Sequence, residues 1–253
     1  MRVICVCNQK GGTGKTTTAW AILTGAAARG YRAIGIDMEI QANLSYIMKA
    51  DPKRASIYNV LKGSCGAQDA IQHTENGDII AASIGLAGVK DAETLKKAVQ
   101  QLQGLYDFVI IDSPPTLTPL LLSCVRAADE IIIPVLADPL AEMALQQITE
   151  SIERANPAAN ILGVLVTDYT GRTILEKDML ANIRDYCRQL QIPCFETPIK
   201  RAVAVQEAQI LHKSIYTYAP RGTATAGFMA LLDAIGIRER GKGKKQGRRS
   251  GNK

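Results

Sequence analysis

Short apolar runs alternate along the chain with longer segments in which apolar residues recur at helical spacing. The short runs are rich in Val and Ile, as is typical of buried strands, and they lie at 3–7, 32–36, 78–82, 106–112, 130–135 and 161–167. Helical spacing predicts helices at 17–29, 56–61, 92–102, 117–127, 140–154, 174–190 and 223–237. This alternation predicts an α/β fold, a doubly wound and mainly parallel sheet flanked by helices, with residues 1–237 forming one domain.

A glycine-rich segment with two lysines follows the first predicted strand and precedes the first predicted helix. It reads Lys10-Gly11-Gly12-Thr13-Gly14-Lys15-Thr16-Thr17. A strand, a glycine-rich loop and a helix form the context that a phosphate-binding loop requires. The glycines let backbone N–H groups turn toward phosphate oxygens, and the helix N-terminus adds partial positive charge. We expect this whole segment to bind a nucleotide, with Lys15 reaching the β- and γ-phosphates and Thr16 helping to hold Mg²⁺.

Two carboxylates at strand ends are candidates for the metal site. Asp112 ends the apolar run that begins at Tyr106, which is typical of a Walker B strand whose carboxylate reaches Mg²⁺ through water. The same carboxylate could instead cap the following helix. Asp37 ends the second predicted strand, at the sheet edge where ligands of doubly wound folds bind. The phosphate-binding loop upstream favours the metal role for both residues.

The variant K-G-G-x-G-K-[ST], formed here by residues 10–16, resembles the deviant Walker A motif of the ParA/MinD superfamily of dimeric ATPases. The D-x-P-P sequence at 112–115, the T-x-Y-x-G-R-T run at 167–173 and the E-A pair at 207–208 are also similar to the ParA/Soj branch. The resemblance covers about residues 1–237. It implies that Lys10 reaches the partner's nucleotide across a dimer interface, and that Thr167 and Asp168 lie near the adenine.

Glu39 stands where the resemblance implies a water-positioning aspartate. Its carboxylate is one methylene longer, and a misplacement of about an ångström can cost ~10²-fold in rate. We therefore expect Lys10, Lys15 and Glu39 to be the catalytic residues of an ATPase that produces ADP and phosphate, with turnover slowed by Glu39. The alternative is that Glu39 is only a solvated loop charge.

The resemblance implies a partition ATPase of the ParA/Soj type. ATP with Mg²⁺ would join two subunits into a homodimer that binds double-stranded DNA without sequence preference. A ParB-like activator would stimulate hydrolysis and release the DNA. A second hypothesis is a nucleotide-gated scaffold that hydrolyses poorly because of Glu39 and regulates a protein partner. Turnover of the wild type against Glu39→Asp discriminates the two.

The net charge of +6 is concentrated at the C-terminus. Residues 238–253 contain eight Lys/Arg and one Glu, which leaves 22 basic and 23 acidic residues in 1–237. Such a polar segment predicts a disordered tail, either a solubilising end or a DNA-binding arm. The candidate DNA contacts are Arg201, which matches the arginine of the family's I-P-R-N turn, then Lys213 and Arg221, and in the tail Lys244, Lys245, Arg248 and Arg249. Exposed Lys and Arg are more often plain surface charge.

Composition argues against a membrane protein. No apolar run approaches the ~20 residues that cross a bilayer. The chain enters a strand at once, without the pattern of a signal peptide. The tail also lacks the bulky apolar residues of an amphipathic membrane helix. The six cysteines include no C-x-x-C pair, which favours a reduced, cytoplasmic protein. The resemblance to the ParA/Soj branch implies association with the nucleoid and no membrane partner.

Overall fold

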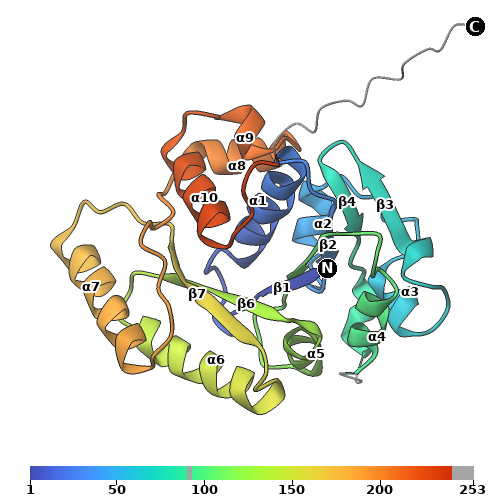
Figure 1. The fold of residues 1–253 in the computed structure, drawn as a ribbon, viewed down its shortest axis with the longest axis horizontal. Helices are drawn as coiled ribbons and strands as arrows, with labels where there is room; N and C mark the ends of the chain where they lie inside the picture. The colour runs from blue at the N-terminus through green and yellow to red at the C-terminus, as the bar shows by residue number, and fades with distance from the viewer. Residues whose placement is uncertain (90–92, 241–253) are drawn as a thin grey trace, which may run out of the picture.

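The computed structural model describes residues 1–89 and 93–240 of the chain. Its centre is a seven-stranded sheet of order β3-β4-β2-β5-β1-β6-β7 (Figure 1), in which β3 is antiparallel to β4 and the other neighbours are parallel. The strands are β1 (Arg2–Val6), β2 (Ala33–Asp37), β3 (Ile71–Thr74), β4 (Gly77–Ile80), β5 (Phe108–Asp112), β6 (Glu130–Leu136) and β7 (Asn160–Thr167). The predicted doubly wound, mainly parallel sheet is confirmed.

Helices cover both faces of the sheet, so the strands are buried on both sides. One face carries α1 (Lys15–Ala28), α2 (Asn43–Ile47), α8 (Val203–Ile210), α9 (Ile215–Tyr218) and α10 (Thr223–Ala234), of which α1, α8, α9 and α10 are grouped together in Figure 1. The other face carries α3 (Ile57–Leu61), α4 (Thr94–Gln100), α5 (Pro119–Ala127), α6 (Ala141–Ala155) and α7 (Ile174–Gln189). Short 3₁₀ turns lie at Gln68–Ala70 and Ile84–Gly88.

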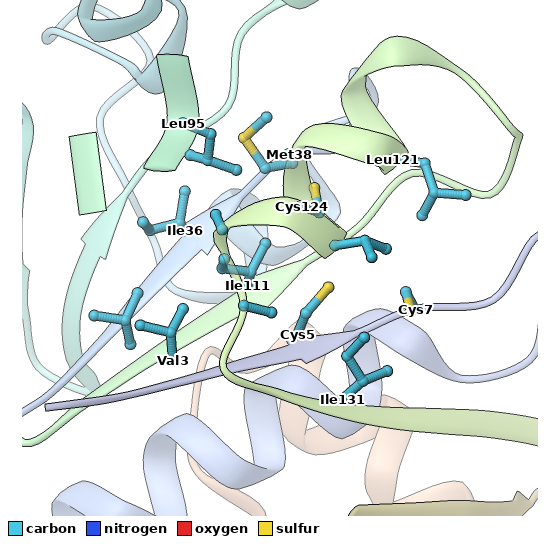
Figure 2. Close-up of a cluster of buried hydrophobic side chains, with 14 of the residues drawn as sticks. Val3, Cys5, Cys7, Ile36, Met38, Leu95, Ile111, Leu121, Cys124 and Ile131 are labelled. Atoms are coloured by element: carbon cyan, nitrogen blue, oxygen red, sulfur yellow. The ribbon is translucent and has the colours of Figure 1, made fainter. Parts of the chain in front are cut away.

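Residues of β1 alternate between the two cores. Ile4 and Val6 pack with α1, whereas Val3 and Cys5 pack on the opposite face with Cys124 of α5 (Figure 2). Hydrogen bonding to Cys124 and burial raise the pKa of the Cys5 thiol well above its usual range, which keeps the thiol protonated and unreactive. All six cysteines are free. In the described ranges, no helix is long and apolar enough to cross a membrane.

The ends of two predicted helices shift for identifiable reasons. Helix α1 begins at Lys15 instead of residue 17, directly after the left-handed Gly14. Helix α5 begins at Pro119, and its N-cap is Thr118, whose hydroxyl accepts a hydrogen bond from Leu121 N. Asp112 therefore does not cap α5, and that alternative is wrong.

The packed part of the chain extends three residues beyond the predicted boundary at 237. Ile237 is fully buried, and Arg240 lies over the Tyr31 ring at 4.3 Å with an ion pair to Asp107 at 3.1 Å. The tail candidates Lys244, Lys245, Arg248 and Arg249 lie outside the described residues.

Candidate nucleotide-binding site

The loop between β1 and α1 has the backbone that a phosphate cradle requires. Gly12 and Gly14 adopt φ of 72° and 80°, in the left-handed region where a side chain is strained. A Cβ on Gly14 would also stand 3.3 Å from the Thr167 hydroxyl oxygen. The first backbone N–H groups of α1 have no partner inside the helix, so the loop and the helix end together present donors to an anion.

Lys15 lies inside this loop and is only 7% exposed. Its Nζ donates to the backbone carbonyl of Lys10 at 3.0 Å, across the loop. Burial lowers the pKa of Lys15, an effect that the negative charges of Asp112 and Glu39 oppose. A phosphate in the loop would exchange a neutral carbonyl partner for an anionic one, which makes a stronger hydrogen bond.

Asp37 and Asp112 are register neighbours at the ends of β2 and β5. Asp37 accepts hydrogen bonds from Ser45 N at 2.8 Å, from Ser45 Oγ at 2.7 Å and from Glu39 N at 3.0 Å. Burial raises the pKa of Asp37 to about 6. Because protein donors already bind both of its oxygens, Asp37 holds the loop that follows β2 in place.

Asp112 is the carboxylate with free acceptors. Both of its oxygens are buried and have no hydrogen-bond partner within residues 1–89 and 93–240. Burial, and then the neighbouring charge of Asp37, raise the pKa of Asp112 well above its usual range, while Thr16 and Lys15 oppose the shift. A buried acceptor pair without donors, next to a hydroxyl, fits a hard divalent cation such as Mg²⁺ and its bound water.

Glu39 borders the hollow above the loop. This cavity, of about 410 Å³, is lined by P-loop residues 11–17 together with Glu39, Gln41, Asn43, Ser113 and Pro115. Glu39 is partly buried, and its charge acts on the pKa of both Lys15 and Asp112. Its carboxylate accepts a hydrogen bond from Gln41 N at 3.4 Å, so Glu39 borders the cavity beside the loop.

Lys10 points away from the loop and forms an ion pair with Asp138 in the same chain. Asp138 also accepts a hydrogen bond from Leu140 N at 3.0 Å, just before α6. The sequence alone does not indicate a role for Asp138. Asp138 lies shortly before the helix predicted at 140–154, and an acidic residue at that position is a common capping pattern.

A second cavity, of about 450 Å³, opens beside the loop. Its walls combine Gly12, Gly14, Thr17, Thr18, Thr167, Asp168, residues 199–203, Val205, Gln206, Gln209 and Phe228. Thr167 Oγ1 donates to the carbonyl of Thr13 at 2.9 Å, which ties the end of β7 to the loop. A partly apolar cavity of this size next to a phosphate cradle suits a nucleoside.

Of the predicted DNA contacts in the folded domain, one lies at the second cavity and two lie on the exposed surface. Arg201 lines the second cavity and forms a two-pronged ion pair with Asp168, Nε to Oδ1 at 2.9 Å and Nη2 to Oδ2 at 2.6 Å. Lys213 follows α8 and Arg221 precedes α10; both are exposed and form no salt bridge with any described residue.

The chain matches known proteins over nearly all of its length. Residues 1–162 match the AAA domain family model. The chromosome-partitioning ATPase Soj of Thermus thermophilus is 31% identical over 247 residues, which cover 93% of this chain and 95% of the relative. The chromosome partitioning protein ParA of Caulobacter vibrioides is also 31% identical, over 95% of this chain and 96% of the relative. The chain belongs to the Soj/ParA family of partitioning ATPases.

Solved structures agree on the fold of this Soj/ParA family member. McdA of Cyanothece, 21% identical, has a TM-score of 0.85 and covers 93% of this chain and 100% of its own. The cobyrinic acid a,c-diamide synthase of Mycobacterium smegmatis, solved with an ATP analogue and magnesium, is 29% identical with a TM-score of 0.79, covering 93% of this chain and 94% of its own. The predicted resemblance to the ParA/MinD superfamily is confirmed.

Proposed function

We propose that this Soj/ParA-family chain is a DNA-partition switch that binds ATP with Mg²⁺, dimerises around the nucleotide and then binds DNA without sequence preference. The observation that carries the proposal is the opposite placement of two lysines on one loop. Lys15 turns into the phosphate cradle, and Lys10 turns away from it to the half-buried Asp138. One lysine is available to the chain's own nucleotide, and the other can reach a second copy once Asp138 releases it.

The residues around the cradle divide the work of hydrolysis. Thr16 and Asp112 would hold Mg²⁺, Asp112 through water, and the ion supplies charge neutralisation on the phosphates. Lys15 stabilises charge on the β- and γ-phosphates. Glu39, at the border of the hollow, orients the attacking water, and its longer side chain makes turnover slow. Hydrolysis to ADP and phosphate, stimulated by a ParB-like activator, then separates the two copies.

The DNA contact comes from exposed basic residues away from the dimer-forming loop. Lys213 and Arg221 contribute from the folded surface, and the basic residues beyond Arg240 add sequence-independent attraction to phosphates. Two copies in a dimer double this charge, so nucleotide-dependent dimerisation raises DNA affinity by bivalency. Such a protein would reside in the cytoplasm, associated with the nucleoid.

Binding to random-sequence duplex DNA tests this function. We expect tight binding with ATP, weak binding with ADP or no nucleotide, and a fall in affinity as salt rises. A chain truncated after Arg240 keeps the docked end and loses six basic residues, which should reduce the salt slope by up to about 5 per chain. Binding that ignores nucleotide would contradict the switch. Absence of DNA binding would instead favour the nucleotide-gated scaffold.

Asp112→Asn should stabilise the nucleotide-free protein while removing its response to MgATP. The raised pKa of Asp112 means that the buried carboxyl costs folding free energy increasingly as the pH rises above about 4. Asparagine keeps a buried polar side chain but cannot ionise, so removing the cost of the buried charge should add about 1–3 kcal/mol at neutral pH, or roughly 2–10 °C in Tm. The gain should vanish near pH 4.

Thermal unfolding with and without MgATP, from pH 4 to pH 8, measures both effects. Asp178→Asn, which changes an exposed carboxylate on α7, is the matched control and should leave Tm and the MgATP response unchanged. A lower Tm for Asp112→Asn at neutral pH would show that protein donors already satisfy this carboxylate.

A further inference from the structure

A salt bridge connects the two segments that form one side of the nucleoside cavity. The end of β7 contributes Thr167 and the following residue Asp168, and the segment that leads into α8 contributes residues 199–203. Tyr169 N donates to Ile199 O at 3.0 Å and Arg201 N donates to Tyr169 O at 3.1 Å, so the two backbones are already joined. The Asp168–Arg201 pair adds a side-chain link next to this backbone bridge.

Asp168 is held in an unusual conformation that directs its carboxylate at Arg201. Its φ of 53° lies in the left-handed region, which few residues other than glycine adopt and aspartate tolerates. Glu176 fixes the loop just beyond, accepting from Thr170 N at 2.6 Å and from Gly171 N at 2.8 Å. Asp168 therefore stands on a rigid support.

Stability does not explain the pair. The side chains of Arg201 and Asp168 are 64% and 47% exposed, and exposed ion pairs contribute little to folding. Both residues nevertheless line the cavity, so the pair lies between the cavity and solvent. A guanidinium in a bidentate ion pair keeps a flat face that can stack on an aromatic ring such as a purine.

We propose that Asp168 is a positioning residue that holds the Arg201 guanidinium against the nucleotide base, so that Arg201 slows nucleotide release. We call this Asp168-supported contact of Arg201 with the base the clasp. This inference rests on the proposed nucleotide-binding function and adds a determinant of nucleotide residence time. It reassigns Arg201, predicted from the sequence as a DNA contact, to the nucleotide. Lys213 and Arg221 then remain as DNA candidates on the folded surface.

Release of a fluorescent ATP analogue, chased with excess ATP in a stopped-flow instrument, tests the clasp in the full chain. Asp168→Asn and Arg201→Gln should each speed release about two- to fivefold, the range that an exposed ion pair supports. The double variant should be no faster than either single variant, because both remove the same contact. Asp168→Glu keeps the carboxylate and should restore slow release.

Two controls separate the clasp from general damage. Arg172→Gln removes an exposed arginine from the same loop and should release the analogue at the wild-type rate. Raising salt should speed release from the wild type more than from Asp168→Asn, because only the wild type has the Asp168–Arg201 ion pair to screen. Equal salt dependence, or additive effects in the double variant, would overturn the clasp.

The remaining outcomes distinguish the clasp from the wider function. Normal release from Asp168→Asn together with tighter DNA binding would mean that Arg201 serves DNA, and would overturn the clasp alone. Unchanged release from every variant, with ATP-dependent DNA binding intact, would also overturn the clasp alone. A wild-type chain that fails to bind the ATP analogue would overturn both proposals.

Discussion

Lys15→Ala is expected to abolish nucleotide binding. Lys15 is the cation buried in the loop, and its only hydrogen bond to a described residue is to the Lys10 carbonyl. Phosphate oxygens would replace that partner with a charge-assisted bond, which contributes roughly 1.5–3 kcal/mol per contact. Affinity for ATP should fall by about a hundredfold or more, since each 1.4 kcal/mol corresponds to about a factor of ten. Equilibrium titration with a fluorescent ATP analogue measures this loss.

The loss should not come from unfolding. Because burial lowers the pKa of Lys15, keeping this amine charged costs folding free energy. Alanine removes that cost, so the Tm of the nucleotide-free variant should equal or exceed that of the wild type. Lys53→Ala, at an exposed position between α2 and α3, is the matched control and should bind ATP normally. Normal ATP affinity in Lys15→Ala would refute the phosphate-binding loop.

The sheet was predictable because its strands are buried on both faces. Residues of β1 and β5 pack alternately into the two cores, so the strands appear in the sequence as continuous apolar runs. The cradle was predictable for a related reason, since glycines, lysine and threonine must follow one another on a single loop. Both patterns lie within a few consecutive residues, so they can be recognised without knowledge of the fold.

Short elements and long-range contacts were not predictable in this way. Helix α2 has five residues, α9 has four, and strand β3 has four, so a period in each depends on only one or two apolar positions and was not recognised. Lys10 and Asp138 are 128 residues apart, and Asp168 and Arg201 are 33 apart. Only the folded chain brings these partners together, so a resemblance that assigns roles one position at a time could not predict either pair.

Lys10 and Arg201 are each held by an acidic residue of the same chain. Asp138 holds Lys10 within its own chain, and Asp168 holds Arg201 at the edge of the second cavity beside the loop. A basic residue predicted for a partner molecule is in each case already paired with an acidic residue of its own chain. In the proposed dimer, Lys10 would exchange Asp138 for the partner's nucleotide, which costs less than leaving the ammonium without a partner.

Lys10→Ala is expected to spare nucleotide binding and to prevent ATP-dependent dimerisation. Within its own chain, Lys10 contributes its backbone to the loop, and its ammonium is directed to Asp138. Removing the side chain should therefore change ATP affinity by no more than about fivefold, because a partly exposed ion pair contributes at most about 1 kcal/mol. Loss of a charge-assisted contact to the partner's nucleotide should weaken the dimer by about ten- to a hundredfold. Sedimentation of the full chain with ATP and Mg²⁺, over a range of protein concentrations, measures the dimer directly.

The structure supplies a control for the trans role of Lys10. Asp138→Asn keeps Lys10 and removes the acidic residue that binds it, so this variant should dimerise at least as well as the wild type with ATP. A dimer weakened equally in both variants would indicate that the pair only supports the start of α6, where Asp138 accepts from Leu140 N. An ATP-dependent dimer of full strength in Lys10→Ala would refute the trans role. Among the described residues, the ammonium of Lys10 has one partner, Asp138 of its own chain, so no other contact within the subunit would obscure this result.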